Sequence, residues 1–345
     1  MRIGTRNIGR VFGPYVIAEI GVNHDGSVER ALELVDAAAG AGADAVKLQL
    51  FNAEMLMSKD ARLAAYQRAA GEADPLEMLR RLELSVDQME PIVARAKARE
   101  VHAIVSVFSV ELVREAERLA WDAYKTASPD IINRPLLEAL AATMRPLIVS
   151  TGTATLDEVE RAVRWLPMIF DRLALLQCVS SYPTPVDRAA LGGIAALREI
   201  SPGPVGYSDH TALIETGGLA VAAGASVLEK HLTYSRAAAG PDHLASLEPA
   251  EFAEYVNGAR RAHLMIGVEK KVVLDVEREV RGVSRQSLTA VRDLSVGHRI
   301  ARADLTVKRP GTGIEPWRMG EVVGRIVGRA IERDSLVREE DLRDG

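Results

Sequence analysis

The chain has 345 residues, of which 48% are apolar and 26% charged, and its formal net charge is −5 at pH 7. These values are typical of a globular protein with more than one domain, and the acidic balance argues against a nucleic-acid partner. The lone cysteine, Cys178, excludes an internal disulfide, and no apolar stretch reaches the roughly 18 residues that a membrane span needs. Residues 1–5 lack the apolar segment of a signal peptide. We therefore expect a cytoplasmic protein that binds neither nucleic acid nor membranes.

Short β-rich runs alternate with helical patterns from Tyr15 to about Gly267. The predicted strands cover residues 15–18, 45–48, 103–105, 123–125, 146–149, 173–176, 204–207 and 225–228, and predicted helices include 156–165, 188–200 and 213–222. Ser27 is predicted to cap the first helix. The alternation predicts a parallel sheet, and eight units in about 250 residues favour a closed (β/α)8 TIM barrel. A Gly-rich dinucleotide motif does not follow the first strand, which weakens the alternative of an open Rossmann sheet.

The pattern changes after the barrel. We expect the barrel to occupy residues 1–268, a charged linker residues 269–285, and a second domain residues 286–345. Short segments at 288–291 and 305–308 read as strands, and a loop rich in proline and glycine follows at 309–313. A domain of roughly 60 residues buries little apolar surface, so we expect its stability to depend on packing against the barrel or another subunit.

Polar side chains gather where the predicted barrel strands end, which is the active-site face of this fold. In chain order they are Glu19, Lys47, Gln49, Ser106, Lys125, Ser128, Ser150, Ser180, Tyr182, Ser208, His210 and His231, and Asp242 follows the last strand. Two imidazoles at adjacent strand ends suit a divalent metal with open positions. Two lysines with several hydroxyls make a cradle for an anion such as phosphate.

Each of these interpretations has an alternative. The histidines could be unrelated loop residues. A lysine at a strand end could be salt-bridged, or could form a Schiff base with a carbonyl substrate. Glu19 and Asp242 are candidates for proton transfer, but Glu19 could equally be a structural partner of a lysine. Cys178 lies in an apolar run, which favours a buried strand position over a nucleophile.

Taken together, the motifs resemble the sialic acid synthase family, the phosphoenolpyruvate-dependent nonulosonate synthases. The matching segments are AEIGVNHDG at 18–26, AGADAVKLQ at 41–49, LIVSTGTAT at 147–155, SYPTP at 181–185, GYSDHT at 206–211, LEKHLT at 228–233 and GPDHLASLEP at 240–249. The segment VKRPGTG at 307–313 looks like the antifreeze-like (SAF) domain of this family. The resemblance covers almost the whole chain, from about Tyr15 to Leu342.

The resemblance implies a role for each matching residue. His210 and His231 would bind Mn²⁺ or Mg²⁺, and Glu19, Tyr182 and Asp242 would act around the reacting carbons, the sugar and the metal-bound water. Arg309 would reach the acceptor sugar in the barrel of a partner subunit, in a domain-swapped homodimer. Phosphoenolpyruvate would be held by Lys47, Gln49, Ser106, Lys125, Ser128, Ser150 and Ser208, with Ser180 among the substrate-binding groups.

Several positions depart from the family pattern. Ser106 and Val107 stand where a Thr-Pro pair is usual, and Pro129 replaces a glycine. Ser180 replaces a common asparagine and Gln177 a common histidine. None of these changes removes a predicted metal ligand or a cradle lysine, so they bear on sugar specificity more than on reaction type.

The implied reaction is the condensation of phosphoenolpyruvate with an open-chain N-acetylated hexosamine, such as N-acetylmannosamine, with C–O cleavage and release of phosphate. The alternatives are a synthase for another nine-carbon acid (legionaminic, pseudaminic or a 9-phosphate product), a Schiff-base aldolase, and a sugar-binding protein in which the second domain is the functional part. The sugar-binding alternative gives no role to His210, His231, Lys47 and Lys125.

Overall fold

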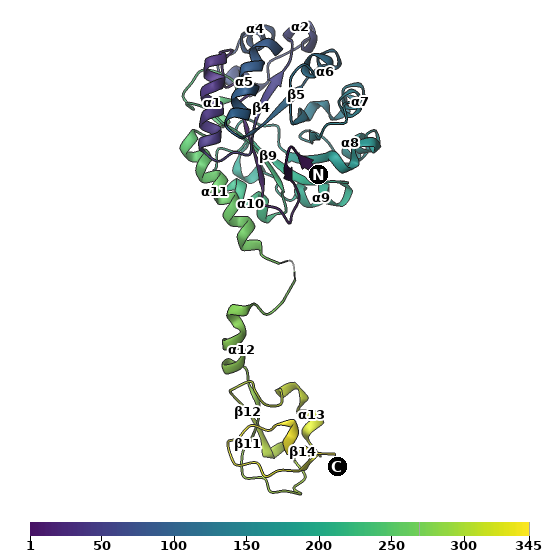
Figure 1. Cartoon of the computed structure of the whole chain (residues 1–345), viewed down its shortest axis with the longest axis vertical. Coiled ribbons are helices and arrows are strands. Elements are labelled where there is room, and N and C mark those ends of the chain that lie inside the picture. Colours follow the sequence, from purple (N-terminus) through teal and green to yellow (C-terminus); the bar gives the residue numbers. More distant parts are fainter. Residues whose placement is uncertain (269, 345) are drawn as a thin grey trace. The chain divides into compact units, whose positions relative to one another are not determined.

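The computed structural model describes residues 1–268 and 270–344. The chain divides into two compact units, Met1–Gly267 and Val268–Gly345, which are described separately (Figure 1).

The first unit is built around a closed barrel of eight parallel strands, in the order β10-β3-β4-β5-β6-β7-β8-β9. The predicted TIM barrel is therefore confirmed, and every predicted barrel strand overlaps an observed one. The strands are β3 (Tyr15–Glu19), β4 (Ala45–Leu50), β5 (His102–Val107), β6 (Ala123–Thr126), β7 (Leu147–Ser150), β8 (Leu173–Cys178), β9 (Val205–Asp209) and β10 (Val227–His231).

Helices surround the barrel, as Figure 1 shows. They are α1 (Val28–Gly40), α5 (Val86–Ala98), α6 (Val110–Ala116), α7 (Arg134–Ala142), α8 (Leu156–Arg164), α9 (Gly193–Ile200), α10 (Thr216–Ala222) and α11 (Pro249–Ile266). The Ser27 side chain accepts a hydrogen bond from the backbone N–H of Arg30, so the predicted cap of α1 is confirmed. The face of α1 that carries Leu34, Val35 and Ala38 is buried in the main core.

A second apolar cluster fills the interior of the barrel. It includes Ile17 of β3, Ile104 of β5, Ile148 of β7 and Leu176 of β8, which point inward. Ile3 and Ile8 join it from the N-terminal hairpin of β1 (Arg2–Ile3) and β2 (Arg6–Asn7). The barrel interior at the N-terminal ends of the strands is thus packed with apolar side chains, and its polar part is confined to the C-terminal ends.

Residues 51–85, between β4 and α5, leave the regular alternation, and we call this segment the β4–α5 excursion. It carries three short helices, α2 (Ala53–Leu56), α3 (Ala65–Ala69) and α4 (Pro75–Leu82). It has its own apolar cluster, which includes Phe51, Leu63 and Met78. The sequence analysis did not predict this addition to the barrel.

The second unit contains α12 (Arg278–Ser284), β11 (Ser287–Ala290), β12 (Leu305–Lys308), α13 (Met319–Val322), β13 (Ile326–Val327) and β14 (Leu342–Arg343). Strands β11 and β12 pair antiparallel, and both overlap the strands predicted there. Leu288, Ile300, Ile314 and Val327 belong to a separate small core. None of the helices described in either unit combines the length and apolarity needed to cross a membrane.

A buried ion pair stabilises the outer wall of the barrel. Lys230 is fully buried, and its ammonium group lies 3.4 Å from Asp209 and donates to the carbonyl of Thr211. The ring centre of Tyr255 in α11 is 5.8 Å from the same nitrogen. Because side chains alternate along β10, the lysine points away from the cavity that Glu229 and His231 face.

We predict that Lys230→Met lowers the free energy of unfolding by roughly 3–5 kcal/mol, because it leaves the carboxylate of Asp209 buried without its partner. Urea unfolding followed by circular dichroism measures this change. The double variant Asp209→Asn/Lys230→Met should recover part of the loss, whereas Lys308→Met, in an exposed pair with Asp334, should change little. Equal effects of the buried and exposed substitutions would contradict the assignment.

Candidate active site

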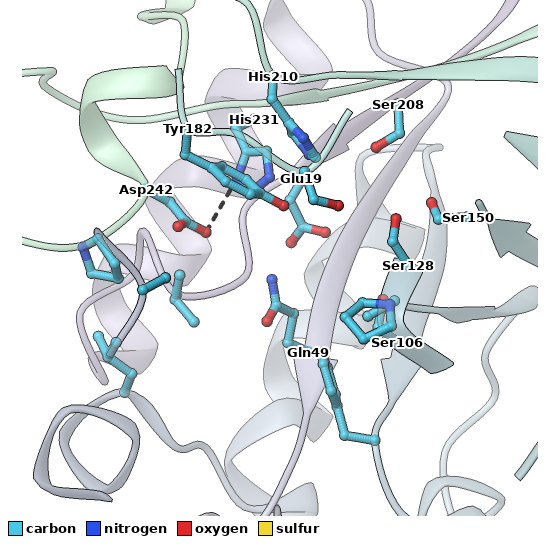
Figure 2. A pocket seen from close by; sticks show the side chains of 18 of the residues that line it. Glu19, Gln49, Ser106, Ser128, Ser150, Tyr182, Ser208, His210, His231 and Asp242 are labelled. Atoms are coloured by element: carbon cyan, nitrogen blue, oxygen red, sulfur yellow. Dashed lines mark ion pairs between the residues drawn. The ribbon is translucent and has the colours of Figure 1, made fainter. Parts of the chain in front are cut away.

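A cavity of about 480 Å³ lies at the C-terminal ends of the barrel strands, within the usual size of a small-molecule site. Every predicted site residue of the first unit lines it. Figure 2 shows the serines on one side, Tyr182, His231 and Asp242 on the other, and Glu19 between them. Arg309 belongs to the second unit, where it is exposed in the loop after β12. Its predicted place in the site of a partner subunit stays a prediction.

Lys47 is the centre of one buried group of polar side chains. Its ammonium group forms an ion pair with Glu19 and donates to the Ser106 hydroxyl at 2.8 Å. Glu19 also accepts from the backbone N–H of Gly21 at 2.6 Å, and a Cβ atom at Gly21 would lie only 2.5 Å from that carboxylate oxygen. Glycine is therefore required for this approach. Burial lowers the pKa of Lys47 to about 7.

Lys125 occupies the centre of a second group. Its ammonium nitrogen lies 3.2 Å from Glu229, which also accepts from the Ser208 hydroxyl at 3.0 Å. The other oxygen of Glu229 is 3.9 Å from Lys47, so this carboxylate lies between the two lysines. Burial raises the pKa of Glu229, but Lys125 and Lys47 outweigh it and the net direction is downward.

Glu229 was missed by the sequence analysis, although a signal was present. It lies two residues before His231 in the same strand, and residues at this spacing face the same side of a strand. Asp130 and Tyr66 also line the cavity and were not predicted to do so. For Tyr66, which lies in the β4–α5 excursion, nothing in the barrel pattern placed its segment near the site.

Hydroxyl groups with few protein partners face the two lysines. Ser150 is buried, and its hydroxyl oxygen has no hydrogen-bond partner among the described residues. Ser128 accepts from the backbone N–H of Gly152 at 3.0 Å. A Cβ atom at Gly152 would come within 2.5 Å of the Ser180 hydroxyl oxygen, so glycine lets these serines close around one space. Free donors beside two ammonium groups can bind a phosphate or carboxylate.

The two histidines lie together, with ring centres 5.5 Å apart. His210 is oriented by a hydrogen bond from its Nδ1 to the carbonyl of Val179 at 2.8 Å, and the Tyr182 ring stacks on it at 4.0 Å. The Nδ1 of His231 lies 3.6 Å from Asp242, the contact drawn in Figure 2, and is buried without a hydrogen-bond partner in the described part of the chain. Burial lowers the pKa of His231 well below its usual value, so its imidazole is neutral.

This arrangement fits a divalent metal. A neutral imidazole such as that of His231 is a common metal ligand, and a ring held through its other nitrogen by a carbonyl, as in His210, is typical of such sites. Within residues 1–268 and 270–344, no three His, Cys, Asp or Glu side chains form a group that could hold a metal. His210 and His231 would therefore leave the remaining coordination positions to water and substrate.

The sequence profile of the NeuB family matches residues 34–271, and that of the SAF domain matches residues 285–343. The chain belongs to the NeuB family. The resemblance to sialic acid synthases stated from the motifs is therefore confirmed, and so is the SAF region after the barrel.

Several relatives of this NeuB-family chain are named as synthases of sugar acids. N,N'-diacetyllegionaminic acid synthase of Legionella pneumophila is 38% identical over 90% of this chain and 89% of its own length. N-acetylneuraminate-9-phosphate synthase of Mus musculus is 31% identical over 95% of this chain and 92% of its own length. The crystal structure of N-acetylneuraminic acid synthetase from Leptospira borgpetersenii, in complex with citrate, superposes with a TM-score of 0.75 at 32% identity, over 81% of this chain and 94% of that chain.

Asp130, which lies beside the serines, should make the stability of the fold depend on pH. Burial raises the pKa of Asp130 to about 6, and one of its oxygens is buried with no hydrogen-bond partner within residues 1–268 and 270–344. Above pH 6 the carboxylate is charged in the folded state and its desolvation opposes folding; below the unfolded pKa of about 4 the group is neutral in both states and this cost disappears.

We therefore expect Asp130→Asn to raise the thermal midpoint at pH 8, and to raise it less at pH 5. Differential scanning calorimetry at the two pH values measures the change relative to the unmodified chain. Asp171→Asn, at an exposed carboxylate, serves as the control and should show no such difference. A gain that is equal at both pH values would show that the charge of Asp130 is not the cause.

Proposed function

We propose that the protein is a nonulosonate synthase that condenses phosphoenolpyruvate with an open-chain N-acetylated hexosamine, cleaves the C–O bond and releases phosphate. The observation that carries the proposal is the shared cavity, in which two buried lysines and several serine hydroxyls face two imidazoles across a fixed carboxylate. The names of the relatives, which are synthases of legionaminic and neuraminic acids, support the same chemistry.

The lysine and serine side is suited to phosphoenolpyruvate. Lys47 and Lys125 neutralise its anionic groups, and hydroxyls of Ser106, Ser128 and Ser150 donate to its oxygens. Gln49, Ser180 and Ser208 complete the cradle. Glu229 lies between the two ammonium groups and holds each of them in position. Binding of phosphoenolpyruvate therefore needs little rearrangement of the lysines.

The histidine side is suited to the sugar aldehyde. His210 and His231 would hold Mn²⁺ or Mg²⁺, which when bound polarises the aldehyde oxygen. Tyr182, stacked on His210, orients the acceptor against this side, and Asp242 can accept a proton from an ordered water at its Oδ2. The two reactants then meet near Glu19.

The condensation forms a bond between C3 of phosphoenolpyruvate and the aldehyde carbon. Water adds to the cation that develops at C2. One of its protons goes to a carboxylate oxygen of Glu19, which Gly21 and Lys47 hold in place, and from there to the former aldehyde oxygen, which becomes a hydroxyl. Cleavage of the C2–O bond then forms the C2 carbonyl, and the second water proton leaves with phosphate, which the cradle binds throughout. The protein's main contribution is to fix both reactants and to exclude bulk water.

Measuring phosphate release tests the proposal. With phosphoenolpyruvate carrying ¹⁸O at the bridging oxygen, Mn²⁺ and a panel of N-acetylated hexosamines, we expect phosphate that contains the label, because the C–O bond breaks. His231→Ala should abolish turnover and weaken Mn²⁺ binding measured by calorimetry, while circular dichroism shows an intact fold. Lys125→Ala should weaken phosphoenolpyruvate binding by roughly 2–4 kcal/mol.

Two results would contradict the proposal. Unlabelled phosphate would mean P–O cleavage and a different reaction. Trapping of substrate on Lys47 or Lys125 by borohydride would favour the Schiff-base aldolase, for which the lowered pKa of Lys47 is the one supporting observation.

We also propose that the protein is a homodimer in which Arg309 of one subunit completes the cavity of the other. A guanidinium donates several hydrogen bonds in a fixed geometry, which suits sugar hydroxyls and an acetamido oxygen. The cytoplasmic location expected from the single cysteine remains a prediction.

Mixing two inactive variants tests the shared site. After subunit exchange, Arg309→Ala chains and His210→Ala chains should regain about a quarter of the unmodified activity, because half of the dimers are mixed and each holds one intact site. Exchange confirmed by mass spectrometry with no return of activity would place the site within one chain.

A further inference from the structure

One wall of the cavity is apolar, and the condensation chemistry above does not use it. The wall is formed by Val22, Leu56, Met57, Met78, Leu79, Leu82 and Phe108. Most of these side chains come from the β4–α5 excursion, and Val22 and Phe108 follow the neighbouring strands β3 and β5. The wall therefore lies over the β3–β5 side of the barrel mouth.

The wall is a packed structure. Met78 and Leu82 are buried in the cluster of the excursion, and the Phe51 and Phe108 rings meet edge to face at 5.9 Å. The Asp74 side chain caps α4 by accepting from two backbone N–H groups. Glu83 accepts from the backbone N–H of Ala53 at 3.0 Å, which ties α2 to the end of α4. Such a wall offers a preformed apolar surface to a ligand.

The excursion also reaches across the mouth. Strands β4 and β8 are opposite each other in the closed barrel order. Tyr66 in α3, which follows β4, stacks at 4.8 Å on Tyr182, which follows β8 and itself stacks on His210. A sugar whose aldehyde lies at the histidines is therefore enclosed between this aromatic stack and the apolar wall.

The charges of the cavity disfavour a second phosphate. Among the described residues that line it, Lys47 and Lys125 are the lysine and arginine side chains, and they face the carboxylates of Glu19, Asp130, Glu229 and Asp242. Phosphoenolpyruvate would already occupy both ammonium groups, and the guanidinium that the proposed dimer would add, Arg309 of the partner subunit, is assigned above to the hydroxyls and the acetamido oxygen of the sugar. A phosphate on the acceptor would add two negative charges beside apolar side chains, where its desolvation is costly.

We propose that the acceptor is an unphosphorylated amino sugar that carries apolar substituents, a second acetamido group or a deoxygenated methyl carbon, at the end remote from its aldehyde. This inference rests on the proposed function, and it selects among the acceptors that the function leaves open. The apolar wall binds these substituents, and Met57 is a specificity-determining residue within it.

Three acceptors test the inference in the full-length protein with phosphoenolpyruvate and Mn²⁺: N-acetylmannosamine, its 6-phosphate, and 2,4-diacetamido-2,4,6-trideoxymannose. We expect kcat/KM for the trideoxy sugar to exceed that for N-acetylmannosamine by about tenfold or more, and the 6-phosphate to be the poorest acceptor. Equal or better turnover of the 6-phosphate, or no preference for the trideoxy sugar, would overturn the inference while the proposed function stands. No phosphate release with any of them would overturn the proposed function, and this inference with it.

Substitutions at two methionines of the excursion locate the effect. Met57 is half-buried and lines the cavity, whereas Met55 is 56% exposed and does not line it. Met57→Gln should lower kcat/KM for the trideoxy sugar about tenfold and leave the KM for phosphoenolpyruvate unchanged. Met55→Gln should change neither, and Met57→Leu, which keeps the wall apolar, should retain the preference. Equal losses in Met57→Gln and Met55→Gln, or a loss in Met57→Leu as large as in Met57→Gln, would refute the role of the wall.

Discussion

The central constraint on this protein is the burial of several charges inside the mouth of one barrel. Lys47 and Lys125 are almost inaccessible, and each is stabilised by a carboxylate that is equally buried. Glu229 contacts both lysines, so its loss would leave two ammonium groups close together in a medium of low polarity. The cradle for an anionic substrate therefore depends on an internal balance of charge that exists before the substrate binds.

The barrel supplies this balance through alternation along its strands. In β10, Glu229 and His231 face the cavity and Lys230 faces the helices, where it meets Asp209. One strand thus contributes a carboxylate and an imidazole to the site and an ammonium group to the wall that holds the strand in place. The apolar plug beneath, with Ile104 and Ile148, keeps the polar groups at the upper level.

Much of this architecture could be predicted from the sequence, because strand ends in a parallel barrel converge whatever lies between them. That rule placed Glu19, Lys125 and His231 at one face without knowledge of their contacts. It did not identify Glu229, because its partners Lys125 and Lys47 come from strands that are distant in the sequence, and nothing beside Glu229 in β10 indicates these contacts. The β4–α5 excursion was missed for a different reason. Its helices are short, and their stability comes from a cluster with Val22 and Phe108, which are far apart in the sequence.

The N-terminal hairpin has a consequence for the traffic of reactants. Ile3 and Ile8 pack into the apolar cluster at the N-terminal end of the barrel interior, whereas the cavity lies at the opposite, C-terminal ends of the strands. Both reactants would enter, and both products would leave, through the same entrance of the cavity. Release is then ordered, because the molecule nearest the entrance must leave before the molecule bound behind it.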